Sequence, residues 1–390
     1  MRSTPSHHST CKRPAGKCLD LCRLLVGLLI GLPYHALCQP ANSYVPISVE
    51  ASSSGTGVHH KKITDFCAGR VESSHRELAF VRAGRYGEAR PGLERAIAVA
   101  EQTKSTDTAA LGCLITAIGF VDIELGRPQE AADWYRRALQ LAPLPDDLQA
   151  LLTNNLANAY LDSLQLDRAE ETARRAIRLY ERAFGTASSE LVFPQLLLAS
   201  VYARRGEYAV AEPVYRRVLH SSERSWGASS YEATHAANVL ASLYLAQGRH
   251  ELARELFARA LVGLRTPTVG TKDEVAVVQA ALAATCAAGG RLREAEVYVQ
   301  QALAAVQELG EESRLMPEIL DRTVIALFYL KQYERAWQVF DRATRLIEVH
   351  QGSEAHMVRF DAYSRLARAV KDKLWAKQIE ARRKAFNSKG

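Results

Sequence analysis

Residues 198–218 read LASVYARRGEYAVAEPVYRRV and predict one complete helical hairpin. An apolar segment ends at a turn over residues 205–207, and a second helix follows. Ala211, Tyr215 and Val218 stand at i, i+4 and i+7, so they share one face of that second helix. Because neither helix can cover its apolar stripe alone, we expect each hairpin to pack against another.

The same pattern returns along most of the chain as a turn, an alanine and, in several copies, an aromatic residue four positions later. The alanines that mark the copies are Ala89, Ala131, Ala169, Ala211, Ala253, Ala295, Ala336 and Ala376. Their spacings run from 38 to 42 residues, and a fixed period in this range indicates a solenoid. In four copies a glycine stands at the end of the first helix, where a left-handed residue is favourable; these are Gly126, Gly206, Gly248 and Gly290.

This arrangement resembles the tetratricopeptide repeat family. The family's motif is met by Ile118, Gly119, Ala131, Tyr135, Ala138 and Pro143, and again by Leu240, Ala241, Tyr244, Ala253, Phe257 and Ala260. The 42-residue period and the strings at 154–157 and 211–217 are similar to the kinesin-light-chain type. The resemblance covers about residues 64–386.

The resemblance implies an all-α fold, a right-handed α-solenoid of stacked antiparallel helix pairs. Residues 63–352 would form about seven pairs, and residues 353–390 a degenerate C-terminal capping repeat with a polar outer face. Two departures support a cap at this end. Lys331 replaces the turn glycine of the seventh copy, and Glu380 replaces the aromatic residue of the eighth.

Residues 1–38 are interpreted as a signal peptide. A basic segment precedes nine apolar or glycine residues at 24–32, and Ala36 and Cys38 supply small residues for cleavage. The alternative is a leucine-rich disordered tail. Residues 39–62 lack helical or strand periodicity and are expected to form a flexible linker. The alanine-, arginine- and leucine-rich repeats favour a bacterial protein exported to the periplasm or the medium.

Composition excludes several classes of protein. The net charge of +7 falls to +3 without residues 1–38, which argues against a nucleic-acid binder. No second long apolar run is present, so no stable membrane insertion is expected after signal cleavage. The three cysteines beyond the signal, Cys67, Cys113 and Cys286, are far apart and are expected to be free and buried.

The sequence carries no catalytic, phosphate-binding or zinc-binding motif, so we expect no enzyme activity, no cofactor and no metal. His250 falls in a repeat turn and is expected to be solvated, and His350 and His356 lack a third ligand. Cys286 occupies the place of a core tyrosine, which argues against a nucleophile.

The resemblance implies that the first helix of each pair lines a concave groove that binds a peptide. The polar residues expected there are Asn154, Asn158, Ser200, Arg204, His235, Asn238 and Ser242. Asparagine both donates and accepts hydrogen bonds, which suits the backbone of an extended peptide. The alternative is that these side chains bond only to neighbouring helices or water.

Apolar residues interrupt this polar row at both ends. Ala280, Ala284 and Ala287 indicate either a shallow apolar pocket or tight packing. Leu78 and Phe120, at the equivalent inner positions of the first two units, are expected to be covered by a partner, by the linker or by closure of the superhelix.

Two functions compete. The first is an exported protein–protein interaction scaffold that binds a protein or extended peptide along its concave groove without catalysis. The alternative is a structural or assembly protein that homo-oligomerises through its end repeats. The basic stretch from Lys371 is expected to form a solvated terminal helix. The alternative is that it contacts an anionic surface.

Overall fold

The computed structural model describes residues 75–102, 107–141, 143–266, 269–309, 313, 315–350 and 373–387. Within these residues every regular element is helical. The predicted signal peptide, the predicted linker and residues 353–372 of the predicted capping repeat lie outside them.

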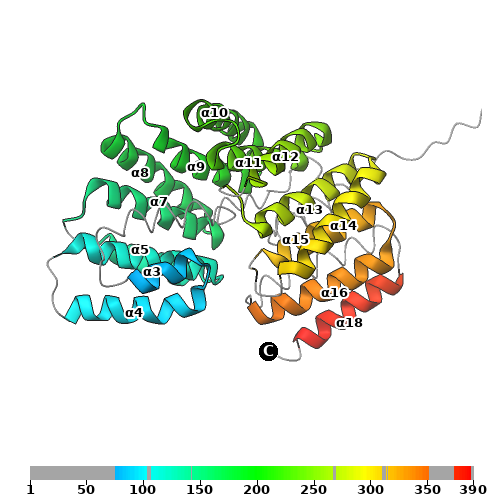
Figure 1. Ribbon diagram of the computed structural model, residues 1–390, viewed down its shortest axis with the longest axis horizontal. Coiled ribbons are helices and arrows are strands. Elements are labelled where there is room, and N and C mark those ends of the chain that lie inside the picture. The colour runs from blue at the N-terminus through cyan, green and yellow to red at the C-terminus, as the bar shows by residue number, and fades with distance from the viewer. Residues whose placement is uncertain are drawn as a thin grey trace, which may run out of the picture.

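The described helices form a stack of antiparallel pairs that follow one another along an arc (Figure 1). The first helices of the pairs are α3 (His75–Arg82), α5 (Thr108–Glu124), α7 (Asp146–Asp162), α9 (Val192–Arg204), α11 (Tyr231–Ala246), α13 (Lys272–Ala288) and α15 (Met316–Tyr329). The second helices are α4 (Tyr86–Gln102), α6 (Pro128–Ala138), α8 (Leu166–Phe184), α10 (Tyr208–Trp226), α12 (His250–Leu264), α14 (Leu292–Leu309) and α16 (Tyr333–His350). A short 3-10 helix, η3 (Ser189–Leu191), precedes α9, and α18 (Lys373–Asn387) ends the stack. The predicted all-α solenoid is confirmed.

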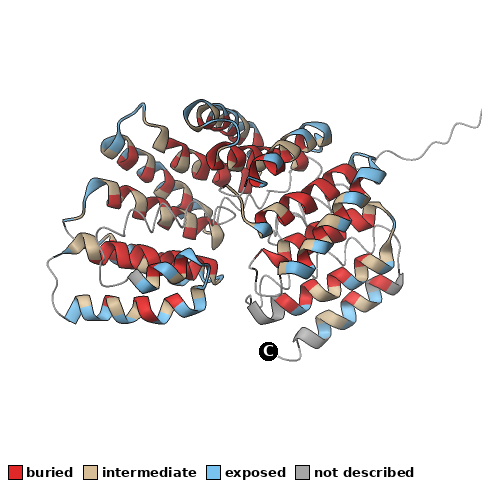
Figure 2. Cartoon of the chain, viewed as in Figure 1, coloured by how far each residue is buried: buried red, intermediate tan, exposed pale blue. Residues whose placement is uncertain are grey.

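The two rows of helices are buried to different extents (Figure 2). Except for α3, where of residues 76–82 only Leu78 and Val81 are buried, the first helices are buried on most sides; in α5, residues 111–124 are all buried. The second helices bury one stripe and expose the rest, as α10 does with Ala211, Tyr215 and Val218. The stripe predicted from the sequence is therefore confirmed, and burial of such stripes drives the stacking.

The close approach within a pair depends on small residues. A Cβ atom on Gly119 of α5 would lie 2.5 Å from Cε1 of Tyr135, so the ring fills the space that glycine leaves. Tyr135 itself is fully buried at 1% exposure. This gap filled by an aromatic ring is the arrangement that the repeat motif predicts.

The turns between paired helices contain a left-handed residue. Gly126, Gly206, Gly248 and Gly290 have φ values of 72°, 80°, 72° and 81°, as predicted. In two turns a residue with a side chain takes the same conformation, Leu164 at φ 58° and Lys331 at φ 59°. The turn geometry therefore persists where the glycine is missing.

The C-terminal helix packs through aromatic residues. Trp375 of α18 is 3% exposed, and its ring centroid lies 4.4 Å from that of Phe328 and 5.8 Å from that of Phe340. Lys377 and Glu380 on the same helix are exposed. Where the structure describes it, α18 thus has one apolar face and one polar face.

Candidate functional site

The first helices form the inner row of the stack, because they contact one another along the chain: α3 with α5, α5 with α7, α7 with α9, and α13 with α15. In a curved stack the row on the inside of the curve is the more crowded one. The concave face is therefore lined by first helices, as expected for the candidate site (Figures 1 and 2).

The predicted polar residues all lie on this inner row, in α7, α9 and α11. Asn154, Ser200, Arg204 and Ser242 are buried, at 7%, 0%, 6% and 8% exposure. Asn158, His235 and Asn238 are half-buried.

The two serine hydroxyls bond within the protein. Ser200 Oγ donates to the carbonyl oxygen of Leu196 at 2.9 Å and accepts from the Tyr215 hydroxyl at 3.0 Å. Ser242 Oγ donates to the carbonyl oxygen of Asn238 at 3.0 Å. The sequence analysis did not predict that Tyr215, on the second helix of this pair, would donate a hydrogen bond to Ser200.

The asparagines differ from the serines because some of their polar atoms have no hydrogen-bond partner in the described part of the chain. These atoms are Asn154 Oδ1, Asn238 Oδ1 and Nδ2 of Asn155, a residue that the sequence reasoning did not single out. Asn158 Nδ2 has a long contact of 3.4 Å to Asp162 Oδ2. A buried amide without a partner costs about 1–3 kcal/mol, so these atoms favour a ligand that supplies the missing bonds.

An aromatic pair and three carboxylates lie on the same row. The rings of Tyr231 and His235 stack in parallel, with centroids 5.8 Å apart. Glu124, Glu232 and Glu274 are buried at 6%, 8% and 2% exposure. Burial raises the pKa of Glu274 to about 8, and it also raises the pKa of Tyr231. The sequence analysis missed these carboxylates because it compared only positions three to four residues apart on each first helix.

The apolar inner positions are packed. Ala280, Ala284 and Ala287 are at most 3% exposed, which agrees with tight packing rather than an apolar pocket. Leu78 and Phe120 are also buried, at 2% and 8% exposure.

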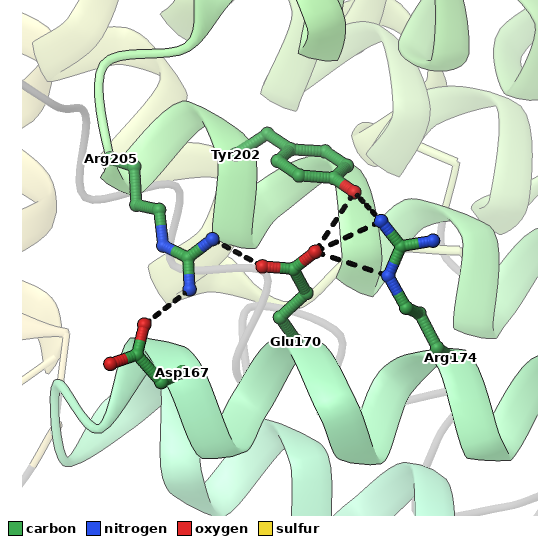
Figure 3. A network of polar contacts seen from close by, with 5 residues as sticks. All are labelled: Asp167, Glu170, Arg174, Tyr202 and Arg205. Carbon is green, nitrogen blue, oxygen red and sulfur yellow. Dashed lines mark hydrogen bonds and ion pairs between the residues drawn. The ribbon is translucent and has the colours of Figure 1, made fainter.

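The turns next to the outer row carry a different polar network (Figure 3). Glu170 of α8 accepts from Arg174 at 2.9 Å and from the hydroxyl of Tyr202 at 3.2 Å, and it pairs with Arg205. Arg205 also contacts Asp167 at 2.7 Å. Burial opposes ionisation of Glu170, but the bonds from Arg205 and Arg174 outweigh it and lower its pKa.

The next unit repeats this network. Glu212 accepts from Tyr244 at 3.1 Å and from Arg249 at 2.9 Å. In the unit after that, Arg254 stands where the glutamate should be, 42 residues beyond Glu212, and Cys286 stands 42 residues beyond Tyr244. The carboxylate and the tyrosine are thus lost together. Because each network joins neighbouring repeats and its polar groups bond to one another, its role is structural.

The remaining candidates for chemistry find little support. Among the described residues, no group of three or more His, Cys, Asp and Glu side chains could hold a metal ion. Cys113 and Cys286 are free and buried as predicted, and burial raises the pKa of Cys286 to about 11. His250 is half-buried rather than solvated, because it packs beside Gly289, and burial lowers its pKa. Cys67 and His356 lie outside the described residues. No described helix combines the length and apolarity needed to cross a membrane.

Comparison with known proteins agrees with this architecture. Residues 70–143, 148–224 and 231–308 match the tetratricopeptide repeat family, and these segments cover more than half of the chain. The chain therefore belongs to the tetratricopeptide repeat family.

A sequence relative supports the resemblance to the kinesin-light-chain type. The protein KINESIN LIGHT CHAIN-RELATED 1 of Arabidopsis thaliana is 26% identical over 133 residues, which cover 32% of this chain and 21% of that protein. The match thus spans about a fifth of the relative's length.

Two solved structures share the fold at low identity. A Rap protein complexed with Competence and Sporulation Factor has a TM-score of 0.63 and 13% identity, covering 96% of this chain and 98% of that one. The Rap conjugation gene regulator of plasmid pLS20, in complex with the Phr* peptide, has a TM-score of 0.56 and 13% identity, covering 85% and 96%.

Proposed function

We propose that this protein is an exported, non-catalytic interaction scaffold that binds an extended peptide or a peptide segment of a partner protein along its concave face. The observation that carries the proposal is the buried carbonyl oxygen Oδ1 of Asn154, which has no hydrogen-bond partner among the described residues. Asn238, on the inner helix two repeats later, has the same unpaired atom. Backbone N–H groups of a bound peptide would satisfy both oxygens without requiring a particular peptide sequence.

Three further observations support the proposal. A helical stack offers a long continuous surface, which suits an extended ligand. The pLS20 regulator, which shares the fold, was solved with the Phr* peptide bound. Family membership agrees with a role in protein interaction.

The peptide-binding part can be tested with random ten-residue peptides displayed on phage and selected on the full chain. Selected peptides are then titrated calorimetrically against wild type and Asn154→Ala/Asn238→Ala. We expect the double variant to bind about tenfold more weakly, since each lost hydrogen bond is worth about 0.5–1.5 kcal/mol. The matched control is Gln140→Ala/His220→Ala, which changes two exposed residues. Gln140 follows the outer helix α6, and His220 lies on the outer helix α10. Unchanged affinity in the asparagine variant would refute binding through these residues.

Export is tested separately. The basic residues before 24–32 and the small residues at Ala36 and Cys38 support it. We expect the chain, expressed in a bacterial host, to be recovered outside the cytoplasm with a new N-terminus near residue 39, measured by intact-mass spectrometry. Recovery of the uncut chain in the cytoplasm would contradict export and leave the peptide-binding test unaffected.

A further inference from the structure

The five middle helices of the inner row differ in charge from the outer helices. Helices α5, α7, α9, α11 and α13 contain eight carboxylates and two cations. The carboxylates are Asp122, Glu124, Asp146, Asp147, Asp162, Glu232, Asp273 and Glu274, and the cations are Arg204 and Lys272. The outer helices α4 to α14 carry carboxylates and arginines in near-equal numbers, and the whole chain has a net charge of +7. An acidic concave face thus lies within a basic protein.

Part of this negative charge is already balanced by the outer row. Asp122 pairs with Arg90 of α4 at 2.7 Å, and Asp146 pairs with Arg182 of α8 at 2.7 Å. These two carboxylates therefore hold the inner and outer rows together, and a ligand would have to compete with an arginine for them.

Three other carboxylates, on three different inner helices, all act on Tyr231 of α11. We call Glu124, Glu232 and Glu274 the acidic site. Glu124 at the end of α5 raises the pKa of both Glu274 and Tyr231, so these groups lie within electrostatic range of one another. Glu232 and Glu274 also raise the pKa of Tyr231. The end of α5 and the beginnings of α11 and α13 therefore share one region of carboxyl groups, which gains a negative charge when Glu274 ionises near pH 8.

Glu274 has one side-chain oxygen that no other described residue contacts by a hydrogen bond. Its Oε2 accepts from the backbone N–H of Thr271 at 2.7 Å and from the Thr271 hydroxyl at 3.0 Å, which completes a capping box at the start of α13. Its Oε1 has no hydrogen-bond partner among the described residues, although the side chain is only 2% exposed. Burial is the main cause of its raised pKa, and the charged groups that add to it, Asp273 and Glu124, are both acidic. The cap thus explains one oxygen of this carboxylate and leaves the other unexplained.

Two members of the acidic site, Glu232 and Glu274, also follow the repeat. Glu190, Glu232 and Glu274 stand 42 residues apart. Glu232 and Glu274 lie at the beginnings of α11 and α13, and Glu190 lies in η3, directly before α9. A row of carboxylates in this register faces the same side of consecutive repeats, and an extended segment would follow that side.

We propose that the acidic site takes an arginine or lysine side chain, so that the segment bound in the groove is a basic peptide. This inference rests on the proposed function and adds the chemistry of the partner to it. A guanidinium or ammonium group would donate to Glu274 Oε1 and offset the repulsion between Glu274 and Glu124. Attraction between opposite charges is stronger in a buried site than in water. A buried carboxylate therefore distinguishes a basic side chain from a neutral one effectively.

The test uses three fluorescein-labelled ten-residue peptides in which serine alternates with arginine, glutamine or glutamate. Binding to the full chain is measured by fluorescence anisotropy at pH 8 and low salt. We expect the arginine peptide to bind at least about tenfold more tightly than the glutamine peptide, and the glutamate peptide not to bind. The triple variant Glu124→Gln/Glu232→Gln/Glu274→Gln should lose that preference. The matched control Glu171→Gln/Glu255→Gln removes exposed carboxylates of the outer row and should keep it.

Each failure has a distinct meaning. Equal binding of the three peptides would refute charge selection and leave groove binding standing. If the triple variant and its control weaken binding of the arginine peptide equally, the effect comes from net charge and the acidic site is overturned. Failure of the arginine peptide to bind would also overturn the acidic site. If Asn154→Ala/Asn238→Ala leaves binding of the arginine peptide unchanged while the triple variant abolishes it, the acidic site stands and the asparagine-lined groove fails.

The pH dependence of binding gives a second readout. Glu274 interacts electrostatically with Glu124 of α5 and with Tyr231 of α11, and Asp273 precedes it on α13. Glu232 of α11 acts on the same tyrosine. Because a cation prefers the ionised carboxylate, affinity for the arginine peptide should rise several-fold between pH 6.5 and 8.5. Glu274→Gln should remove this rise, and an unchanged rise in that variant would overturn the role of Glu274.

Discussion

The inner and outer rows of helices come from the same repeat but use polar residues in different ways. On the outer side, Glu170 and Glu212 each meet a tyrosine and an arginine, so their charge is paired. On the inner side, Asn154 and Glu274 are more deeply buried, and each keeps an atom without a hydrogen-bond partner in the part of the chain that the structure describes. Buried polar atoms without partners reduce stability. The comparison indicates that the outer networks hold the repeats together, whereas we propose that the inner polar groups bind a peptide.

The largest expected effect concerns Glu274. The folded protein holds its proton up to about pH 8, whereas the unfolded carboxyl group releases it near 4.5. Stability should therefore fall as pH rises between these values, by on the order of 3–5 kcal/mol. Glu274→Gln should be stable to rising pH over this range, measured by urea unfolding at pH 5, 6.5 and 8. A wild type that keeps the same stability from pH 5 to 8 would contradict the burial of this carboxyl group.

A glycine from each row gives the next contrast. A Cβ atom at Gly119 of α5 would collide with the Tyr135 ring, whereas one at Gly87 of α4 meets nothing within 4 Å. Gly119→Ala should destabilise the protein by about 1–3 kcal/mol through overpacking. Gly87→Ala should stabilise it by about 0.5–1 kcal/mol, because alanine favours a helix. Both are measured by thermal unfolding, and effects of the same sign would show that the two rows pack alike.

The repeat and its stripes could be predicted from the sequence because they are local and periodic. Ala211, Tyr215 and Val218 share a face in any helix, whatever surrounds it. Ser200 could not be assigned in this way, since its partner Tyr215 belongs to the other helix of its pair. The acidic site is harder still, because Glu124 and Glu274 are 150 residues apart and act on each other only through the curvature of the stack. Sequence patterning predicts which residues face inward and does not predict which of them meet.

The outer networks should contribute less per residue than the inner contacts. Arg249 is 40% exposed where it meets Glu212, so solvent screens the pair. We expect Glu212→Gln to cost about 1 kcal/mol at pH 7. Burial raises the pKa of Glu212, but the bonds from Arg249 and Tyr244 outweigh it and leave the pKa lowered. This contribution is therefore present above pH 4.5 and lost as pH falls through the lowered value.

The difference in unfolding free energy between wild type and Glu212→Gln should shrink between pH 6 and pH 3. The exposed Glu255→Gln, on the neighbouring outer helix α12, is the control and should change stability by less than about 0.5 kcal/mol. A difference that stays constant with pH would show that the ionised carboxylate is not what stabilises this junction.

The smallest effect is expected at a turn that joins the two rows. Leu164 follows α7 with φ 58°, a left-handed conformation that costs a residue with a side chain about 1–2 kcal/mol. Glycine adopts it without strain but loses more entropy on folding, so Leu164→Gly should gain about 0.5–1 kcal/mol in urea unfolding. The neighbouring Ser163→Gly is the control. Ser163 has a negative φ of −86° and its Oγ donates to the Ala159 carbonyl at 2.7 Å, so glycine there should destabilise the protein. If Leu164→Gly also destabilises the protein, packing of the exposed leucine outweighs its backbone strain. The loss of glycine from this turn would then be compensated by the contacts of the leucine side chain.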